Sequence, residues 1–170
     1  MPKPTPFKKV NNVFVETGCF MGDGIQQALD SGFNNVISIE LTDKFSDICV
    51  DRFRGDNRVS ILKGDAANCL YGVIEEINEP ITFWLDGHFS GGDTGNGVVE
   101  DPIIFELEAI KNHHINNHLI YIDDIRLYKN GHFATTLEQL ISKVLEVNPE
   151  YSISYEHGIE EDDILIAEIK

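Results

Sequence analysis

The chain has 170 residues, a length that fits a single domain. Hydrophobic residues make up 42% of it, which is enough for a buried core and excludes a globally disordered chain. Lys and Arg number 13 against 29 Asp and Glu, and the resulting net charge of −16 argues against a protein that binds nucleic-acid phosphates or anionic membrane surfaces.

The chain begins with a polar segment, residues 1–12, which contains three prolines and three lysines. It lacks the apolar centre of a secretory signal, and no apolar run in the chain reaches the ~20 residues of a membrane span. The three cysteines have no CxxC spacing, which favours free thiols in a reducing compartment over disulfides or a zinc site. We therefore expect a cytoplasmic protein with an N-terminal arm, 1–12, and one domain, 13–170.

Strand and helix patterns alternate from residue 13 onward. Apolar residues at helical spacing predict a helix after each of the first five strands, most clearly from Leu70 to Ile77. Helix starts are predicted at Asp101, which precedes a proline, and at a capping box of Thr135 and Glu138. Short apolar runs predict those five strands at 13–16, 36–40, 59–62, 81–85 and 119–122.

The end of the chain breaks this alternation. Residues 151–155 and 164–169 predict two strands with no helix between them, so we expect them to pair as an antiparallel hairpin. The acidic turn at 160–163 is expected to be solvated surface. The whole pattern predicts an α/β fold: a Rossmann-like, doubly wound, seven-stranded, mostly parallel sheet with a C-terminal antiparallel hairpin.

Ligands of such sheets bind beyond the carboxyl ends of the strands, so the residues that follow each strand form the candidate site. The first turn runs from Glu16 to Gly24, and its glycines permit tight turning close to a helix N-terminus. A plain strand–helix turn is the alternative, and the glycine spacing fits a dinucleotide fingerprint poorly.

Two further acids stand at strand ends. Glu40 ends the second strand about 20 residues after the first turn, where an acid meets ribose hydroxyls in nucleoside-binding folds; an exposed strand-end acid is the alternative. Asp65 follows the third strand, where it is placed to cap the next helix or to accept a hydrogen bond from an adenine amino group. These two roles of Asp65 can coexist.

Acids also follow the fourth and fifth strands, as Asp86 and as the pair Asp123 and Asp124. If these strands are neighbours, three carboxylates lie close together and repel one another unless a cation or a proton intervenes. Hard divalent cations favour such oxygen ligands, so Asp86, Asp123 and Asp124 form a candidate metal site. The alternative is that one of the paired acids bonds the backbone and the other is solvated.

Histidines offer a candidate general base. His88 lies two residues after Asp86 on the loop 87–101, which contains five glycines and is expected to close over a ligand. A hydrogen bond that orders this loop is the alternative role of His88. His132 is placed to reach the site from the loop after the fifth strand, whereas His113 and His114 are expected at an exposed helix end.

The combined pattern resembles class I S-adenosylmethionine-dependent methyltransferases. The likeness rests on the acid-x-Gly-x-x-x-Gly turn at 16–22, Glu40, the Gly-Asp-Ala segment at 64–66 and the terminal hairpin. The acids at 86, 123 and 124 also resemble those of metal-dependent O-methyltransferases, and residues 84–92 resemble small FkbM-like methyltransferases. The chain departs from the family at Phe20, where a glycine is common, and it has no room for an N-terminal helical cap before residue 13.

This resemblance implies S-adenosylmethionine (SAM) as the cofactor. It places the first turn at the methionine moiety, Glu40 at the ribose, Asp65 and Ala66 at the adenine, and Asp86 at the methionine amino group or the metal. The implied cofactor contacts are Glu16, Gly18, Phe20, Gly22, Asp23, Gly24, Glu40, Leu41, Asp65, Ala66 and Asp86.

The expected reaction is O-methylation of a small molecule or sugar hydroxyl. Mg²⁺ or another divalent cation on Asp86, Asp123 and Asp124 would lower the pKa of that hydroxyl, and His88 would take its proton. His88, Asp86 and Asp124 are thus the catalytic candidates. We expect a homo-oligomer, with the arm 1–12 contacting a neighbouring subunit that completes the site. A protein that binds SAM or a nucleotide without methyl transfer, a SAM enzyme with other chemistry and a nucleotide-dependent oxidoreductase remain as alternatives.

Overall fold

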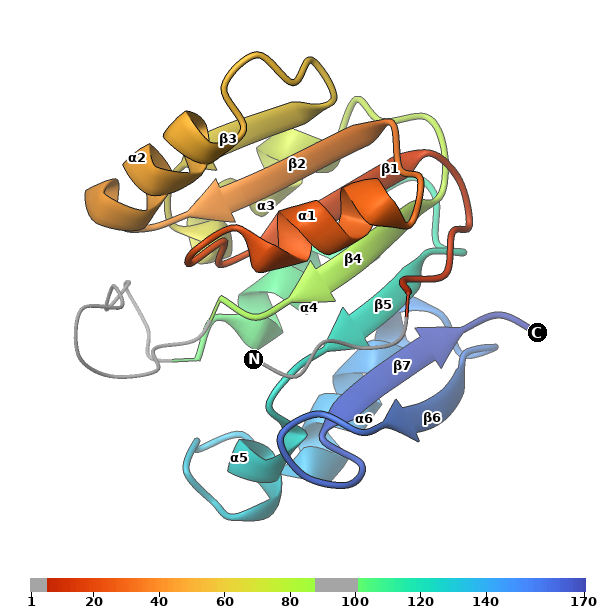
Figure 1. Ribbon diagram of the computed structural model, residues 1–170. Coiled ribbons are helices and arrows are strands. Elements are labelled where there is room, and N and C mark those ends of the chain that lie inside the picture. The colour runs from red at the N-terminus through yellow and green to blue at the C-terminus, as the bar shows by residue number, and fades with distance from the viewer. Residues whose placement is uncertain (1–5, 88–100) are drawn as a thin grey trace.

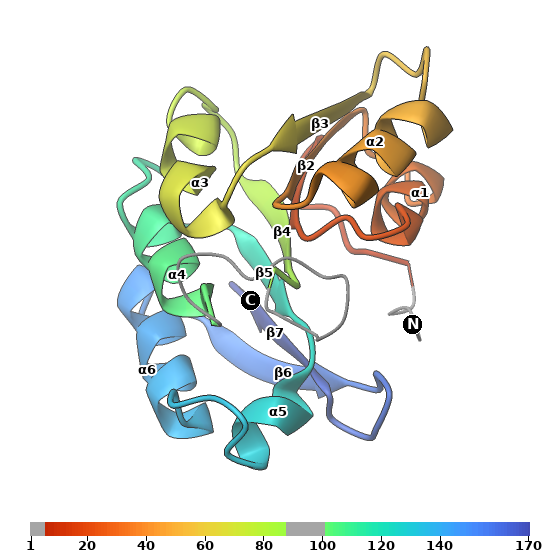
Figure 2. The same cartoon turned by 90° about the vertical axis from the view of Figure 1, so that its left-hand side faces the viewer.

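The computed structural model describes residues 6–87 and 101–170. Their helices and strands form three layers, a central sheet between two groups of helices (Figure 1 and Figure 2). Within the described ranges, no helix combines the length and apolar character that a bilayer crossing requires.

The sheet has seven strands in the order β3-β2-β1-β4-β5-β7-β6. The first five are parallel, and β7 runs antiparallel to both β5 and β6. This arrangement confirms the predicted sheet and its C-terminal hairpin. The strands are β1 (Val13–Thr17), β2 (Asn35–Glu40), β3 (Val59–Lys63), β4 (Ile81–Leu85), β5 (Leu119–Ile122), β6 (Ser152–Glu156) and β7 (Ile164–Glu168).

Helices cover both faces of the sheet (Figure 2). On one face lie α1 (Asp23–Asp30) and α2 (Asp43–Arg52), and on the other lie α3 (Ala66–Ile74), α4 (Ile103–Lys111) and α6 (Leu137–Val147). A short helix that the sequence did not predict, α5 (Ile125–Lys129), follows β5. The central strands β4 and β5 are mostly apolar because each faces a hydrophobic core on both sides. In β4, Phe83 packs into the core beneath α3, α4 and α6, and Trp84 into the core beneath α1 and α2.

The predicted helix starts are close but not all correct. The capping box at α6 consists of Thr136 and Gln139, so the expected pair Thr135 and Glu138 is wrong by one residue. Oγ1 of Thr136 accepts a hydrogen bond from the Gln139 N–H, and the Gln139 side chain accepts one from the Thr136 N–H. The sequence allows a capping box at either threonine, because Thr135 is followed three residues later by Glu138 and Thr136 by Gln139. At α4 the N-cap is Pro102, so the expected start at Asp101 is also wrong by one residue, although Oδ1 of Asp101 accepts a hydrogen bond of 3.3 Å from the N–H of Ile103.

Residues 6–12 of the arm lie against the sheet of their own chain. Phe7 is only 4% exposed, and its ring centroid lies 4.8 Å from that of Phe14, 5.3 Å from Trp84 and 5.4 Å from Tyr121. The backbone N–H of Lys8 donates to the Tyr121 hydroxyl over 3.2 Å. This part of the arm therefore stabilises its own domain. The remainder of the arm, which we expected to contact a second subunit, lies outside the described residues.

Two buried histidines, His113 and His118, lie near the N-terminal ends of β4 and β5. His118 Nδ1 accepts a hydrogen bond from the Ile81 N–H over 3.0 Å, so its proton is on Nε2, which faces His113 Nδ1 at 3.1 Å. His113 Nε2 in turn lies 3.0 Å from the carbonyl oxygens of Ile74 and Ile77. The expectation that His113 is exposed is wrong, because these carbonyls at the end of α3 draw it inward to 5% exposure. Burial lowers the pKa of His118 to about 4, and the neighbouring His113 adds to this shift.

Candidate functional site

The turn after β1 sits at the centre of the C-terminal edge of the sheet. Gly18 has a φ of +83°, and its N–H donates to the carbonyl oxygen of Ile39 in β2 over 2.8 Å. A Cβ atom at this position would lie 2.5 Å from the carbonyl oxygen of Asp86. Glycine is therefore required at 18 both by its backbone conformation and by the close approach of the turn after β4.

Glu16 lies beneath this turn and is 1% exposed. Its Oε2 accepts a hydrogen bond of 2.6 Å from the hydroxyl of Ser38 in β2. Its Oε1 lies so close to Gly24, in the first turn of α1, that any Cβ atom at Gly24 would overlap it. Glu16 therefore joins β1, β2 and the start of α1, and its predicted contact with the methionine moiety stays a prediction.

Glu40 is buried and accepts four hydrogen bonds from its own chain. Oε2 accepts from the N–H groups of Cys19 and Phe20 at 3.1 and 3.3 Å, and Oε1 accepts from the N–H and hydroxyl of Thr42 at 2.9 and 2.8 Å. A carboxylate offers about four acceptor positions, so these donors use all of them in this conformation. Glu40 thereby ties the first turn to the start of α2.

Phe20 lies in the turn after β1, where the resemblance of the sequence to methyltransferases leads us to expect a glycine. Its φ is +46°, which is uncommon for a residue with a side chain. The ring is 44% exposed and its centroid lies 4.6 Å from that of Phe45. Phe20 thus adds an apolar surface beside the turn. Gly22 is the N-cap of α1, with a φ of +83°, and Asp23, the first residue of the helix, pairs with Arg52 at 2.9 Å.

The remaining predicted cofactor residues line the same edge near α3. Oδ1 of Asp65 accepts a hydrogen bond of 3.0 Å from the Ala67 N–H, which confirms that Asp65 caps α3. Leu41 and Ala66 follow the ends of β2 and β3 and are partly exposed. The capping role of Asp65 does not test its predicted contact with adenine, which stays a prediction.

The predicted acidic residues after β4 and β5 come together at this edge. The N–H of Asp86 donates to the Thr17 carbonyl oxygen and the N–H of Asp123 to the Leu85 carbonyl oxygen, each over 3.2 Å. Asp123 and Asp124 are 4% and 6% exposed. Burial raises the pKa of Asp86 well above its usual value, and the charges of Asp123 and Asp124 raise it further. A positive charge bound here would relieve this repulsion.

One member of this acidic group was not predicted. Asp163, just before β7, was expected on solvated surface, yet it is 1% exposed. The Arg126 guanidinium draws it inward: Nη1 lies 2.5 Å from Asp163 Oδ2 and also contacts Asp124 Oδ1. The Arg126 N–H donates to the other oxygen of Asp163 over 2.8 Å. Asp163 therefore holds the turn before β7 against the start of α5.

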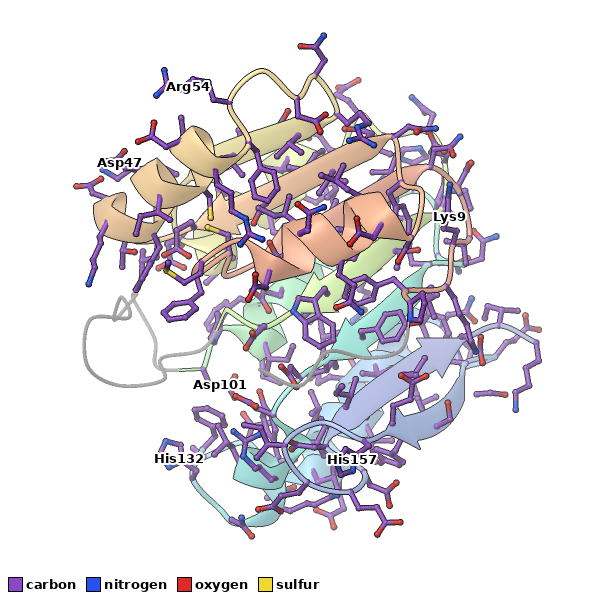
Figure 3. All side chains as sticks on the ribbon, in the orientation of Figure 1. Lys9, Asp47, Arg54, Asp101, His132 and His157 are labelled. Atoms are coloured by element: carbon purple, nitrogen blue, oxygen red, sulfur yellow. The ribbon has the colours of Figure 1, made fainter. Side chains whose placement is uncertain are left out.

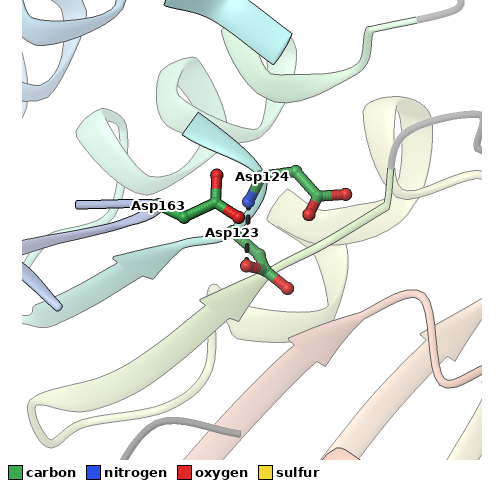
Figure 4. Close-up of side chains that lie close together, drawn as sticks. All are labelled: Asp123, Asp124 and Asp163. Atoms are coloured by element: carbon green, nitrogen blue, oxygen red, sulfur yellow. Dashed lines mark hydrogen bonds between the residues drawn. The ribbon is translucent and has the colours of Figure 1, made fainter. Parts of the chain in front are cut away.

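Figure 4 shows how the three aspartates converge. In the part of the chain that the structure describes, Asp123, Asp124 and Asp163 are the one group of three or more acids, histidines or cysteines whose ligand atoms all lie within 4.8 Å of one another. Asp86, one of the three predicted metal ligands, is not in this group. Two of its members already contact Arg126, so a cation here would compete with the guanidinium.

Of the two histidines considered for the site, only His132 lies within the described residues. His88 and residues 88–100 of the expected lid lie outside the described residues. Asp101, just before α4, accepts a hydrogen bond of 3.0 Å from the hydroxyl of Tyr128 in α5. His132 is exposed on the loop between α5 and α6 (Figure 3).

Sequence reasoning also missed Glu106, a residue of α4 that is 1% exposed. A signal for it exists in the sequence. Glu106 stands three residues after Ile103 and one before Leu107, so it falls on the apolar side of a predicted helix. A charged residue on that side is exceptional and marks a candidate functional position.

Comparison with known proteins identifies the fold. No protein-family model and no curated protein matches the chain. Among solved structures, an O-methyltransferase from Bacillus cereus in complex with S-adenosylhomocysteine (SAH) is similar, with a TM-score of 0.65 and 17% identity over 94% of this chain and 74% of that one. The SAH-bound methyltransferase PaMTH1 of Podospora anserina gives a TM-score of 0.62 and 11% identity over 94% of this chain and 72% of that one.

A third similar structure is the fibrillarin of Aeropyrum pernix with natively bound SAM. Its TM-score is 0.64 at 9% identity, over 92% of this chain and 66% of that one. Likenesses at such low identity show the fold. The chain therefore has the fold of class I SAM-dependent methyltransferases, as its motifs predicted.

Proposed function

We propose that this chain is a SAM-dependent methyltransferase that acts on a hydroxyl group of a small molecule or sugar. The observation that carries the proposal is that carboxylates gather at the ligand-binding edge of a methyltransferase fold, where Glu16 and Asp123 are buried and Asp86 is partly buried. SAM carries a positive sulfonium and a positive ammonium group, which such carboxylates attract. The net charge of −16 disfavours a polyanionic acceptor.

The residues of this chain would mainly bind and orient the two substrates, while the cofactor supplies the electrophilic methyl group. The turn from Gly18 to Gly22 would hold the methionine part, and Asp65 the adenine. Glu40 would bind the ribose. Because four donors already use its oxygens, a ribose hydroxyl would replace one of them, such as the hydroxyl of Thr42.

The proposal also includes a general base and a metal ion. His88 would accept the proton of the acceptor hydroxyl. Asp86, Asp123 and Asp124 offer the hard oxygen ligands that Mg²⁺ prefers, and a divalent cation there would lower the pKa of the hydroxyl. Asp124 would then exchange its contact with Arg126 for the cation. Unchanged SAH affinity and activity after EDTA treatment and after Mg²⁺ addition would remove the metal from the proposal.

Calorimetry tests the cofactor. We expect SAM and SAH to bind with micromolar affinity and NAD not to bind. Gly18→Ala would lose at least about tenfold in SAH affinity, because the new Cβ pushes the turns after β1 and β4 apart. Gly55→Ala is the matched control: Gly55 also has a positive φ, of +85°, but has open space around it. Absence of SAM and SAH binding, or binding of NAD instead, would contradict the proposal.

We also propose that the protein is cytoplasmic and forms a homo-oligomer. The three cysteines are free, which suits a cytoplasmic enzyme. We further propose that a second subunit completes the acceptor side of the site in this homo-oligomer. Analytical ultracentrifugation tests this, and a monomer at micromolar concentration would contradict it.

A further inference from the structure

The four hydrogen-bond donors that surround the carboxylate of Glu40 differ in how easily they can leave it. Three of them are backbone N–H groups, those of Cys19, Phe20 and Thr42. Two of these belong to the turn after β1 and the third to the N-cap of α2, so none can leave unless the main chain moves. The fourth donor is the hydroxyl of Thr42, which lies 2.8 Å from Oε1. Rotation about the Cα–Cβ bond of Thr42 is enough to release it.

The Thr42 hydroxyl has a second partner at the start of α2. Its oxygen accepts a hydrogen bond from the Phe45 N–H over 3.4 Å, which makes Thr42 the N-cap of this helix. That distance is longer than usual for an N–H···O bond, so the cap holds the hydroxyl weakly. Thr42 is partly exposed. A ligand hydroxyl can therefore approach Oε1 of Glu40 from solvent and take the place of the Thr42 hydroxyl.

We propose that Thr42 is a specificity-determining residue of the cofactor site, because its hydroxyl competes with the cofactor's ribose for Glu40. This inference rests on the proposed function, in which Glu40 binds the ribose. A carboxylate has about four acceptor positions, and donors of the chain itself use all of them. A ribose hydroxyl must displace the Thr42 hydroxyl, and the lost internal hydrogen bond subtracts from the affinity. The competition acts only against ligands that carry a ribose hydroxyl.

Calorimetry with SAH and Thr42→Ala tests this without knowledge of the acceptor. Alanine removes the competing hydroxyl but keeps the backbone N–H that donates to Oε1. We expect the dissociation constant of SAH to fall by about fivefold, the equivalent of one net hydrogen bond. Adenosine should show the same gain. The analogue 2′,3′-dideoxyadenosine lacks the 2′ and 3′ hydroxyls, so its affinity should not change.

Two further variants separate competition from loss of the helix cap. Thr42→Ser keeps a hydroxyl at this position and should bind SAH as the wild type does. Thr136→Ala is the matched control, because it removes the corresponding N-cap hydroxyl from α6 on the other face of the sheet. Both alanine variants should unfold at a lower urea concentration, since each loses an N-cap. Only Thr42→Ala should bind SAH more tightly, whereas a role confined to stability predicts no gain in affinity.

If Thr42→Ala binds SAH with unchanged or weaker affinity, the hydroxyl does not compete with the ribose and the inference is wrong. An equal gain for 2′,3′-dideoxyadenosine would also overturn it, because that ligand has no 2′ or 3′ hydroxyl to place at Glu40. Both results leave the proposed function standing. If the wild type binds neither SAM nor SAH, the proposed function itself fails, and the inference fails with it.

Discussion

Acidification should destabilise this protein through the buried His118. Its Nδ1 accepts the N–H of Ile81, so a second ring proton would face a donor rather than an acceptor. Burial holds the pKa of His118 at about 4 in the folded state, against 6.5 in an unfolded chain. Between these values the unfolded chain binds more protons than the folded one, so the free energy of unfolding falls as the pH falls.

The size of this effect follows from the two pKa values. The full difference corresponds to about 3 kcal/mol, reached only below pH 4. Between pH 8 and pH 5, the contribution of His118 to the free energy of unfolding should fall by about 2 kcal/mol. Asp86 acts with the opposite sign, because a carboxyl whose pKa is raised by folding takes up a proton more readily in the folded state.

Urea denaturation at pH 8, 7, 6 and 5 measures the effect. A variant is needed to separate His118 from Asp86, and His118→Asn suits because its side-chain oxygen can accept the same N–H of Ile81. Its free energy of unfolding should be lower than that of the wild type at pH 8, and the gap should close by about 2 kcal/mol toward pH 5. His157→Asn, at an exposed position on the turn after β6, is the control and should follow the wild type (Figure 3).

A constant gap between the wild type and His118→Asn from pH 8 to pH 5 would refute this reasoning. It would mean that the ring takes up a proton in the folded state without loss of its hydrogen bonds. An equal closing of the gap in His157→Asn would instead point to a general charge effect.

Three other predictions concern stability, and urea denaturation at pH 7.5 measures each. Phe7→Ala should cost about 3 kcal/mol and shift the emission of Trp84, the sole tryptophan, and an unchanged spectrum would contradict the packing described. Gly24→Ala should destabilise by about 1–3 kcal/mol because the new Cβ atom meets Glu16. Gly72→Ala, in open space on α3, should stabilise by about 0.5–1 kcal/mol. Equal effects of the two substitutions would refute the close contact at Gly24. Arg126→Met should cost about 3 kcal/mol because buried carboxylates lose their partner, and a loss below about 1 kcal/mol would show that they do not depend on it.

The sequence predicted the fold because local patterns and the global architecture agree. Apolar runs such as 81–85 need two buried faces, and only a sheet covered on both sides provides them. The hairpin at the end followed from the lack of room for a helix between its strands. The short helix α5 escaped notice because five residues are too few to show a helical period.

Prediction of the site was less complete, because some of its residues are brought in by distant partners. The positions of the acids at the ends of β1 and β2 and after β4 and β5 could be predicted, because strand ends can be read from local pattern. Asp163 looked like part of a solvated acidic turn, and only the fold shows that Arg126 lies opposite it. Glu40 was predicted as a ribose ligand from its position, and that role stays a prediction, while its four hydrogen bonds depend on turns that no local pattern specifies.

The docking of residues 6–12 has a consequence for the order in which the chain folds. Phe7 packs only where β4 and β5 already lie side by side, and Lys8 pairs with Glu168 across 160 positions of sequence. Contacts between such distant segments form late, because the chain must first close a long loop. During synthesis, the packing of Phe7 must wait for β5 to emerge, and the pairing of Lys8 must wait for β7. Until then the aromatic surface of Trp84 and Tyr121 stays uncovered, and that interval is when the nascent chain is most exposed to aggregation.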